Sequence, residues 1–234
     1  MKPVFRFPLF CYIAVIAAFL AGVLGCSRAV TVFSENRPLL RQQCIIVDPG
    51  HGGEDGGATS CTGVRESQFN LEISLRLRDL LHLLGYDTRM TRETDISIYT
   101  EGSTIAARKL SDLKNRVKSV NAAENGFLIS IHQNMFTDSQ YSGAQVFYAG
   151  NETSKLLAQA MQTAMVAHLN PGSRRRCKQA EGVYLMEHIQ CTGVLIECGF
   201  LSNPEEEAKL RTPEYQKKIC CVIVTALDEY LSNT

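Results

Sequence analysis

The 234-residue chain has no excess of charge of either sign, since 24 Lys and Arg stand against 24 Asp and Glu. With a formal net charge of zero, no sequence-wide field attracts nucleic acid or an anionic membrane surface. The densest basic cluster is the run Arg174–Arg176, where we predict a solvated loop rather than a ligand site. Binding to nucleic acid is therefore not expected.

The sequence also lacks any CxxC pair, although it contains nine cysteines. This absence argues against a zinc site built on thiolates. The seven cysteines beyond Cys26 are an odd number and include the adjacent pair Cys220 and Cys221, so they define no disulfide framework. We expect scattered buried thiols, as in a protein from a reducing setting.

No internal repeat or low-complexity block interrupts the chain from Cys44 onward. A chain of this length with 45% apolar residues can bury the core of one compact domain. The glycine turn "PGHGGEDGG" lacks the lysine of a GxxxxGKS phosphate loop and does not fit GxGxxG after a strand. A nucleotide site at this turn is not expected.

One long apolar run is present at the amino terminus, where two basic residues precede the uncharged stretch from Pro8 to Gly25. Its length is near the minimum for spanning a bilayer and exceeds most signal-peptide cores. We interpret residues 1–26 as a signal or membrane anchor, with the uncleaved anchor preferred, and residues 27–43 as a linker. The stretch "VLGCS" resembles a lipoprotein processing site, so lipidation of Cys26 is the alternative.

From Cys44 onward, short β-branched runs alternate with longer helical patterns, which is typical of α/β folds. Strands are predicted at residues 44–48, 86–92, 127–132, 144–149, 183–186 and 193–198. Helices are predicted at residues 66–85, 111–125, 153–169 and 213–231. We therefore expect a single α/β domain, residues 44–234, with a mixed, mostly parallel central sheet flanked by helices.

Two histidines each follow an apolar strand: "CIIVDPGH" ends in His51 and "FLISIH" ends in His132. Glu66 opens the helix after the first strand. Since ligands gather beyond the carboxyl ends of strands in open α/β sheets, these three side chains can face one point. Two imidazoles and one carboxylate with a fourth position open form the zinc site of hydrolytic enzymes.

Taken singly, each of these residues has a simpler interpretation. His51 would satisfy a tight turn, Glu66 would complement the dipole of its helix, and His132 would form a hydrogen bond at a strand end. The histidines His82, His168 and His188 keep such interpretations, because none of them follows a strand into a glycine turn.

A fourth candidate, Glu197, lies at the far end of the apolar strand in "GVLIECGFLSNP". Burial there raises the pKa of a carboxyl group, so Glu197 is either paired or poised to exchange protons. An enzyme that activates water with zinc needs a group that takes up the proton and passes it to a leaving amine. We assign that role to Glu197.

With these residues in place, the sequence resembles the zinc-dependent N-acetylmuramoyl-L-alanine amidases that cut bacterial peptidoglycan. The motifs, in family order between residue 44 and about residue 230, are "DPGHGG", Glu66 before "NLEISLRLRDLL", "TRETD", "SIHQN" and "LIECGFLSN". The resemblance implies that His51, Glu66 and His132 bind Zn²⁺ and that Glu197 is catalytic. Gln133 stands where the family often has a small residue.

Within the family, the likeness is to the germination-specific spore-cortex amidases, through "EGSTIAARKLSDLKNRVKSVN", "SGAQVFYAG", "EGVYLMEH" and "ECGFLSNPEEE". It implies hydrolysis of the amide between N-acetylmuramic acid and L-alanine in peptidoglycan. A deacetylase would then form muramic δ-lactam, and an accessory lipoprotein is a possible partner. The enzyme would be exported and membrane-anchored, with its catalytic domain outside the cytoplasm, in the cell envelope or the forespore intermembrane space.

Two alternatives remain open. The same metal chemistry would serve a zinc peptidase or aminoacylase that acts on another amide. A non-catalytic wall-binding module is the alternative from another class, and the presence of all four site residues argues against it.

Overall fold

The computed structural model of the protein describes residues 43–233. The expected anchor, the alternative lipidation at Cys26 and the expected linker up to residue 42 lie outside the described residues. Among residues 43–233, no helix combines the length and the apolar character needed to span a bilayer.

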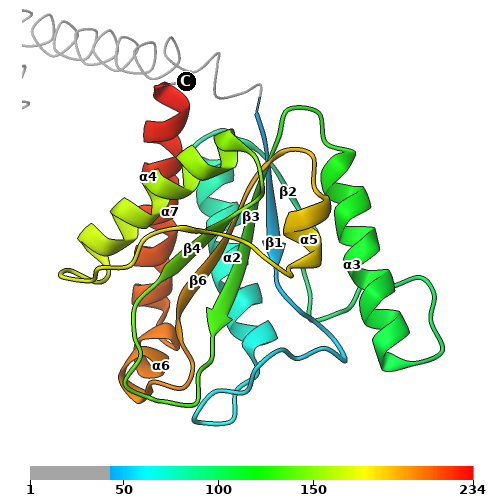
Figure 1. Ribbon diagram of the computed structural model, residues 1–234, viewed down its shortest axis with the longest axis horizontal. Helices are drawn as coiled ribbons and strands as arrows, with labels where there is room; N and C mark the ends of the chain where they lie inside the picture. Colours follow the sequence, from blue (N-terminus) through cyan, green and yellow to red (C-terminus); the bar gives the residue numbers. More distant parts are fainter. Residues whose placement is uncertain (1–42, 234) are drawn as a thin grey trace, which may run out of the picture. The chain divides into compact units, whose positions relative to one another are not determined.

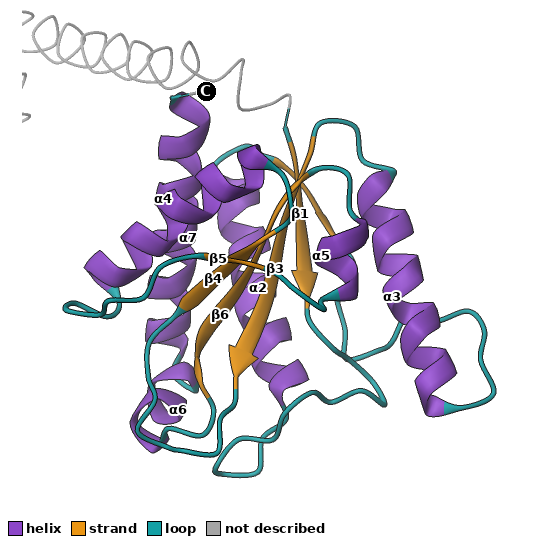
Figure 2. Ribbon diagram, viewed as in Figure 1, coloured by secondary structure: helices purple, strands orange, loops and turns teal. Residues whose placement is uncertain are grey.

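A six-stranded sheet forms the centre of the described domain, in the order β2-β1-β3-β6-β4-β5 (Figure 1; β5 is labelled in Figure 2). Its strands are β1 (Cys44–Pro49), β2 (Asp87–Met90), β3 (Gly126–Asn134), β4 (Gln145–Tyr148), β5 (Lys178–Gln179) and β6 (Thr192–Phe200). All neighbouring strands are parallel except β4 and β6, which pair antiparallel. The predicted mixed, mostly parallel sheet is confirmed.

Helices cover both faces of this sheet (Figure 2). They are α2 (Glu66–Leu83), α3 (Ile105–Asn121), α4 (Glu152–His168), α5 (Tyr184–His188), α6 (Pro204–Leu210) and α7 (Pro213–Ser232). On one face α2 packs against β1 and β3, α4 packs against β4 and β6, and both helices contact α7.

The helices α3 and α5 cover the opposite face of the sheet. Successive strand residues point to opposite faces of a sheet. The strand residues Ile46, Leu128 and Leu195 are buried with Val120 of α3 and Leu185 of α5 in one apolar cluster. The apolar strands are thus covered on both sides, which leaves the ends of the strands as the place for polar chemistry.

One predicted strand, residues 183–186, is wrong, because Val183 caps the short helix α5 and the other three residues belong to it. Leu185, Met186 and Ile189 are all buried, and their spacing fits one face of a helix. An apolar run of four residues does not distinguish a strand from a helical turn by period alone. The prediction also missed α6, which Asn203 caps through its side chain and Pro204 begins, and the two-residue strand β5.

All seven cysteines within residues 43–233 are free. Cys44, Cys198 and Cys220 are buried, as expected, whereas Cys61 and Cys221 are exposed. The expectation of buried thiols is therefore confirmed for three of the seven.

The arginine run lies in a loop, as predicted, but its middle residue is partly buried. Arg174 and Arg176 are exposed. Arg175 instead donates a hydrogen bond of 3.1 Å from Nε to the carbonyl oxygen of Ser142, and its guanidinium lies 5.0 Å from the ring centroid of Phe200. Arg175 therefore has a structural role that the charge run alone did not indicate.

Candidate metal centre

The structure brings His51, Glu66 and His132 together at the carboxyl edge of the sheet. β1 and β3 are parallel neighbours whose carboxyl ends lie at one edge (Figure 1). His51 follows β1, His132 lies near the end of β3, and Glu66 is the first residue of α2. One ligand atom from each lies within 4.8 Å of the others, and no other such group of three occurs among the described residues.

The donor atoms of this cluster converge on Glu66. Its Oε2 lies 3.3 Å from His51 Nε2, and its Oε1 lies 3.0 Å from His132 Nδ1. The two imidazole rings meet edge to face, with centroids 5.0 Å apart and planes at 74°. Two nitrogen donors and one carboxylate thus face a common point, which is a donor set that transition metals prefer.

Three further hydrogen bonds hold the Glu66 carboxylate, which is only 4% exposed. The backbone N–H of Ala58 donates to Oε2 at 3.0 Å, while the N–H of Gln133 and the side chain of Asn70 donate to Oε1 at 3.2 Å. Burial by itself would raise the pKa of Glu66, but hydrogen bonds from His132 and His51 outweigh it and hold the pKa well below its usual range. Glu66 therefore stays ionised and fixed.

His51 adopts a backbone conformation that side chains rarely take, with φ of 61°. Arg116 holds this turn by donating from Nη2 to the His51 carbonyl oxygen at 2.7 Å. The ring is oriented by Asp55, whose Oδ2 lies 3.0 Å from Nδ1, so Nε2 points at Glu66. A carboxylate behind a histidine in this way fixes the ring and raises its basicity as a ligand.

The pKa of His51 is raised to about 9. Burial lowers it, but the hydrogen bonds and negative charges of Asp55 and Glu66 outweigh burial. Without a metal ion, the His51 imidazole therefore carries a second proton and is positively charged at neutral pH. A metal ion has to displace that proton before it binds.

The glycines of the turn leave the room that these ligands occupy. A Cβ atom on Gly50 would lie 2.2 Å from the His132 ring. Gly57 has φ of +66°, and a Cβ atom there would lie 2.5 Å from Glu66 Oε2 and 2.7 Å from the His51 ring. The turn after β1 is therefore rich in glycine because the ligands pack against its backbone.

Two buried arginines fix the end of β1 beneath the cluster. Arg116 pairs with Asp48 at 2.6 Å and donates to the carbonyl oxygen of Pro49 at 2.8 Å. Arg92 donates to the carbonyl oxygens of Pro49 and Gly50 at 3.0 and 2.9 Å. Arg92 belongs to the "TRETD" motif and Asp55 follows His51 by four residues, but sequence reasoning gave neither a role.

Glu197 lies in β6, directly opposite His132 in the parallel register of β3 and β6. Its Oε2 is enclosed and has no hydrogen-bond partner within the described part of the chain. Burial, together with the negative charge of Glu66, raises its pKa from 4.5 to about 7, although the histidines oppose the shift. The predicted upward shift is confirmed, and such a carboxyl group can exchange protons near neutral pH.

The histidines that sequence reasoning set aside lie elsewhere. His82 is in the last turn of α2, near the carbonyl oxygen of Thr88, and His168 ends α4. His188 contacts Tyr184 within α5.

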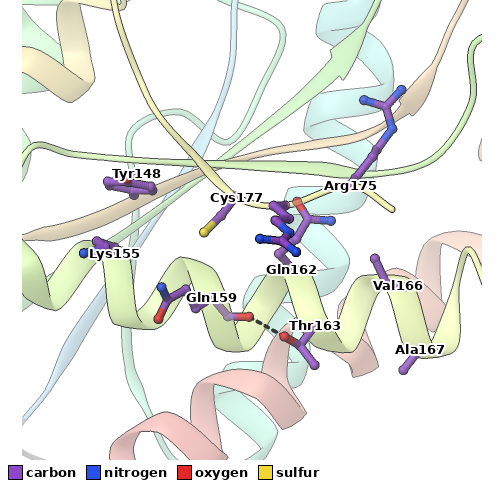
Figure 3. A pocket seen from close by; sticks show the side chains of 10 residues that line it. Tyr148, Lys155, Gln159, Gln162, Thr163, Val166, Ala167, Arg175 and Cys177 are labelled. Atoms are coloured by element: carbon purple, nitrogen blue, oxygen red, sulfur yellow. Dashed lines mark hydrogen bonds between the residues drawn. The ribbon is translucent and has the colours of Figure 1, made fainter. Parts of the chain in front are cut away.

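A cavity of about 540 Å³ lies along α4, away from the cluster (Figure 3). Tyr148, Lys155 and Cys177 are among its lining residues, but no residue of the metal cluster and no part of Glu197 lines it. The chemistry of the site therefore lies at the sheet edge and not in this cavity.

Residues 45–229 match the family model described as N-acetylmuramoyl-L-alanine amidase. The chain belongs to the N-acetylmuramoyl-L-alanine amidase family. This amidase is 38% identical over 196 residues to the germination-specific N-acetylmuramoyl-L-alanine amidase of Bacillus subtilis (strain 168), a match that covers 83% of this chain and 82% of the relative.

Solved amidase structures are similar to this amidase. The CwlD amidase from Clostridioides difficile, solved in complex with the GerS lipoprotein, is 36% identical with a TM-score of 0.78, over 82% of this chain and 99% of that one. An N-acetylmuramoyl-L-alanine amidase from Clostridium difficile 630 is 28% identical with a TM-score of 0.71, over 83% and 99% of the two chains. The amidase therefore acts on peptidoglycan, and its His-Glu-His cluster is consistent with the metal site of the family.

Proposed function

We propose that this amidase uses zinc, held by His51, Glu66 and His132, to hydrolyse the amide between the lactyl group of N-acetylmuramic acid and L-alanine. Glu197 transfers a proton from the attacking water to the departing alanine nitrogen. The observation that carries the proposal is the contrast between two neighbouring carboxyl groups. Glu66 is hydrogen-bonded and ionised, whereas Glu197 has an unpartnered oxygen and a raised pKa.

The donor set fits zinc. Zinc binds imidazole nitrogen and carboxylate oxygen at about 2.0–2.2 Å, so donors of a tetrahedral site lie about 3.3–3.5 Å apart. The His51 Nε2 to Glu66 Oε2 distance of 3.3 Å is of that size. Magnesium and calcium prefer oxygen ligands alone, which this cluster does not offer. When bound, zinc would polarise the amide carbonyl and lower the pKa of a water molecule.

The side chains of this protein then supply the proton transfers. Glu197 accepts a proton from the attacking water as the new carbon–oxygen bond forms. It donates a proton to the alanine nitrogen as the carbon–nitrogen bond breaks, so the carboxylate is regenerated. Asp55 keeps the imidazole of His51 oriented throughout.

The proposed substrate is the peptidoglycan of the spore cortex. Support comes from the similarity to a germination-specific amidase and to CwlD. Removal of the stem peptide would leave muramic acid with a free lactyl carboxylate. A deacetylase that forms muramic δ-lactam would then use this product.

We further propose that the enzyme is exported and held at the membrane by residues 1–26, with its catalytic domain outside the cytoplasm, in the cell envelope or forespore intermembrane space. Support comes from the uncharged apolar run in the sequence. An accessory lipoprotein is the proposed partner, because the similar CwlD amidase was solved with the GerS lipoprotein. Recovery of a soluble chain that begins after residue 26 would contradict the anchor, and a lipid on Cys26 would favour the alternative.

The proposed reaction is tested by incubating the zinc-loaded full chain with peptidoglycan and identifying the products by mass spectrometry. The proposal predicts intact stem peptides with a free L-alanine amino group and glycan strands with free lactyl carboxylates. Shortened stem peptides still attached to glycan would instead indicate the alternative, a zinc peptidase.

A further inference from the structure

The loop of residues 135–144, between β3 and β4, carries exposed apolar side chains close to the metal cluster. Met135, Phe136 and Tyr141 in this loop are 45%, 50% and 43% exposed. Phe136 follows His132 by four residues, so the chain can separate their Cα atoms by at most about 14 Å. Side chains of this kind next to a reaction centre mark a recognition surface.

The backbone of this loop is fixed from beneath by the turn after β6. Ser202 Oγ accepts a hydrogen bond of 3.3 Å from the backbone N–H of Phe136. The side chain of Asn203 donates to the carbonyl oxygen of Ser139 at 2.9 Å. The exposed rings are therefore carried on a positioned backbone, which reduces the entropy lost when they bind a ligand.

Arg175 adds a further support. Figure 3 shows its side chain turned away from the other residues that line the α4 cavity. Its side chain contacts the Ser142 carbonyl oxygen in the loop and the ring of Phe200, as described above, and donates to Gln145 Oε1 at 3.4 Å. The loop is thus fastened at its far end as well.

The aromatic rings form a stack that begins in the core and ends in solvent. Phe200 is only 4% exposed, and Tyr141 stacks near it with ring centroids 6.3 Å apart and planes at 27°. Phe136 stands nearly perpendicular to Tyr141, at 4.8 Å and 81°. The Phe136 side chain is half exposed, and one neighbouring ring can cover at most one of its faces, so a face of Phe136 remains free for a ligand.

The chemistry of the substrate indicates what this surface binds. The cleaved amide joins a peptide to an uncharged glycan strand, so a sugar has to lie on one side of the reaction centre. The C–H groups on the face of a sugar ring carry partial positive charge, and the face of an aromatic ring is negative. A protein partner would need about 800 Å² of surface, far more than three side chains supply.

We infer that Phe136 and Tyr141 form a glycan subsite, on which a sugar ring of the substrate strand stacks while the metal cluster holds the amide. The inference rests on the proposed amidase reaction. It assigns to this loop the binding of the strand and no part in the chemical step.

The test compares two substrates that carry the same stem peptide. One is a peptidoglycan strand, and the other is a lactoyl peptide with no sugar. In the zinc-loaded full chain, Phe136→Ala should raise KM for the strand about fivefold to tenfold. It should leave kcat for the strand and kcat/KM for the lactoyl peptide unchanged. Phe136→Trp should retain the wild-type KM, whereas Phe136→Leu, which is apolar but has no ring, should behave like Phe136→Ala.

Leu156→Ala is the matched control, because Leu156 is an apolar residue of α4 with a similar exposure of 46%. It should keep wild-type values for both substrates. Binding is measured separately by saturation-transfer NMR with chitotetraose, an uncharged sugar chain without peptide. The wild-type protein should transfer saturation to this probe, and Phe136→Ala should lose most of that signal.

A wild-type KM in Phe136→Ala would overturn the inference. Wild-type behaviour of Phe136→Leu would also overturn it, because it would indicate a general apolar contact such as a protein partner makes. Equal losses on both substrates would also overturn it and make Phe136 structural. If the wild-type protein cleaved neither substrate, the proposed function would fail, whereas the glycan subsite would fail only if chitotetraose also did not bind. Chitotetraose binding in that case would show the failure to lie in the chemistry.

Discussion

Two carboxyl groups at the same edge of the sheet, Glu66 and Glu197, have opposite surroundings. Glu66 receives backbone and side-chain hydrogen bonds and faces two imidazoles, and its pKa is held low. Glu197 has an enclosed oxygen without a partner, and its pKa is raised to about 7. The same residue type is thus prepared by its environment as a metal ligand in one case and as a proton carrier in the other.

The difference follows from where each carboxylate meets the backbone. Glu66 begins a helix beside the glycine turn, where backbone N–H groups such as that of Ala58 are free to donate. Glu197 lies within a strand whose backbone groups are already used by its neighbours β3 and β4. The position of Glu197 within β6 therefore encloses its carboxyl group without offering it a backbone hydrogen bond.

The largest expected effect comes from Glu197→Gln, which keeps the shape of the side chain but cannot accept a proton. Turnover should fall on the order of a hundredfold to ten-thousandfold, as loss of a general acid and base usually costs. Zinc content should stay at one ion per chain. Elemental analysis and amide cleavage are measured on the same preparation, since a loss of zinc would make Glu197 a ligand.

The matched variant is Glu66→Gln, which should lose both zinc and turnover, because the amide is a poor ligand. His132→Ala should behave in the same way. Full zinc stoichiometry in His132→Ala would remove that residue from the site.

The second effect concerns the stability of the metal-free protein. The pKa of Glu197 is about 7 when folded and 4.5 ordinarily. The folded state therefore holds this proton more tightly. The resulting stability is present below pH 4.5 and is lost as the pH rises through 7, by about 3 kcal/mol in total.

In denaturant titrations of the full chain, the free energy of unfolding of the metal-free wild type should fall by that amount relative to Glu197→Gln between about pH 4.5 and pH 8. Parallel curves for the two proteins would show that Glu197 is ionised in the fold at all of these pH values.

A smaller effect is expected from Asp55→Asn, which removes the carboxylate behind His51. Zinc affinity should weaken by about tenfold to a hundredfold, as is usual for such supporting residues. Competition with a chelator of known affinity measures the change. Unchanged affinity would mean that the backbone conformation of His51 alone orients its ring.

The sequence alone predicted much of the fold and the membership of the cluster. His51 and His132 were recognisable because each stands at the end of an apolar run, and parallel strands bring such ends to one edge. Glu197 was recognisable because a carboxylate directly after the apolar residues 194–196 is unusual.

The supporting residues were not predictable in this way. Asp55 contacts His51 within a turn where the backbone at His51 takes a positive φ, which no periodic pattern encodes. Arg116 comes from a helix whose surface pattern does not distinguish it from solvated arginines, although its side chain is 2% exposed. The helix at Tyr184–His188 was missed because its apolar run is too short to show a period.

The most direct test is to titrate the two carboxyl groups themselves. Carbon-13 NMR of the metal-free full chain with labelled glutamate would follow both resonances, which are assigned by their loss in Glu197→Gln and Glu66→Gln. We expect the Glu197 carboxyl to titrate with a midpoint near pH 7 and Glu66 to stay ionised throughout that range. A Glu197 midpoint at or below 4.5, its ordinary value, would contradict the assignment of opposite roles.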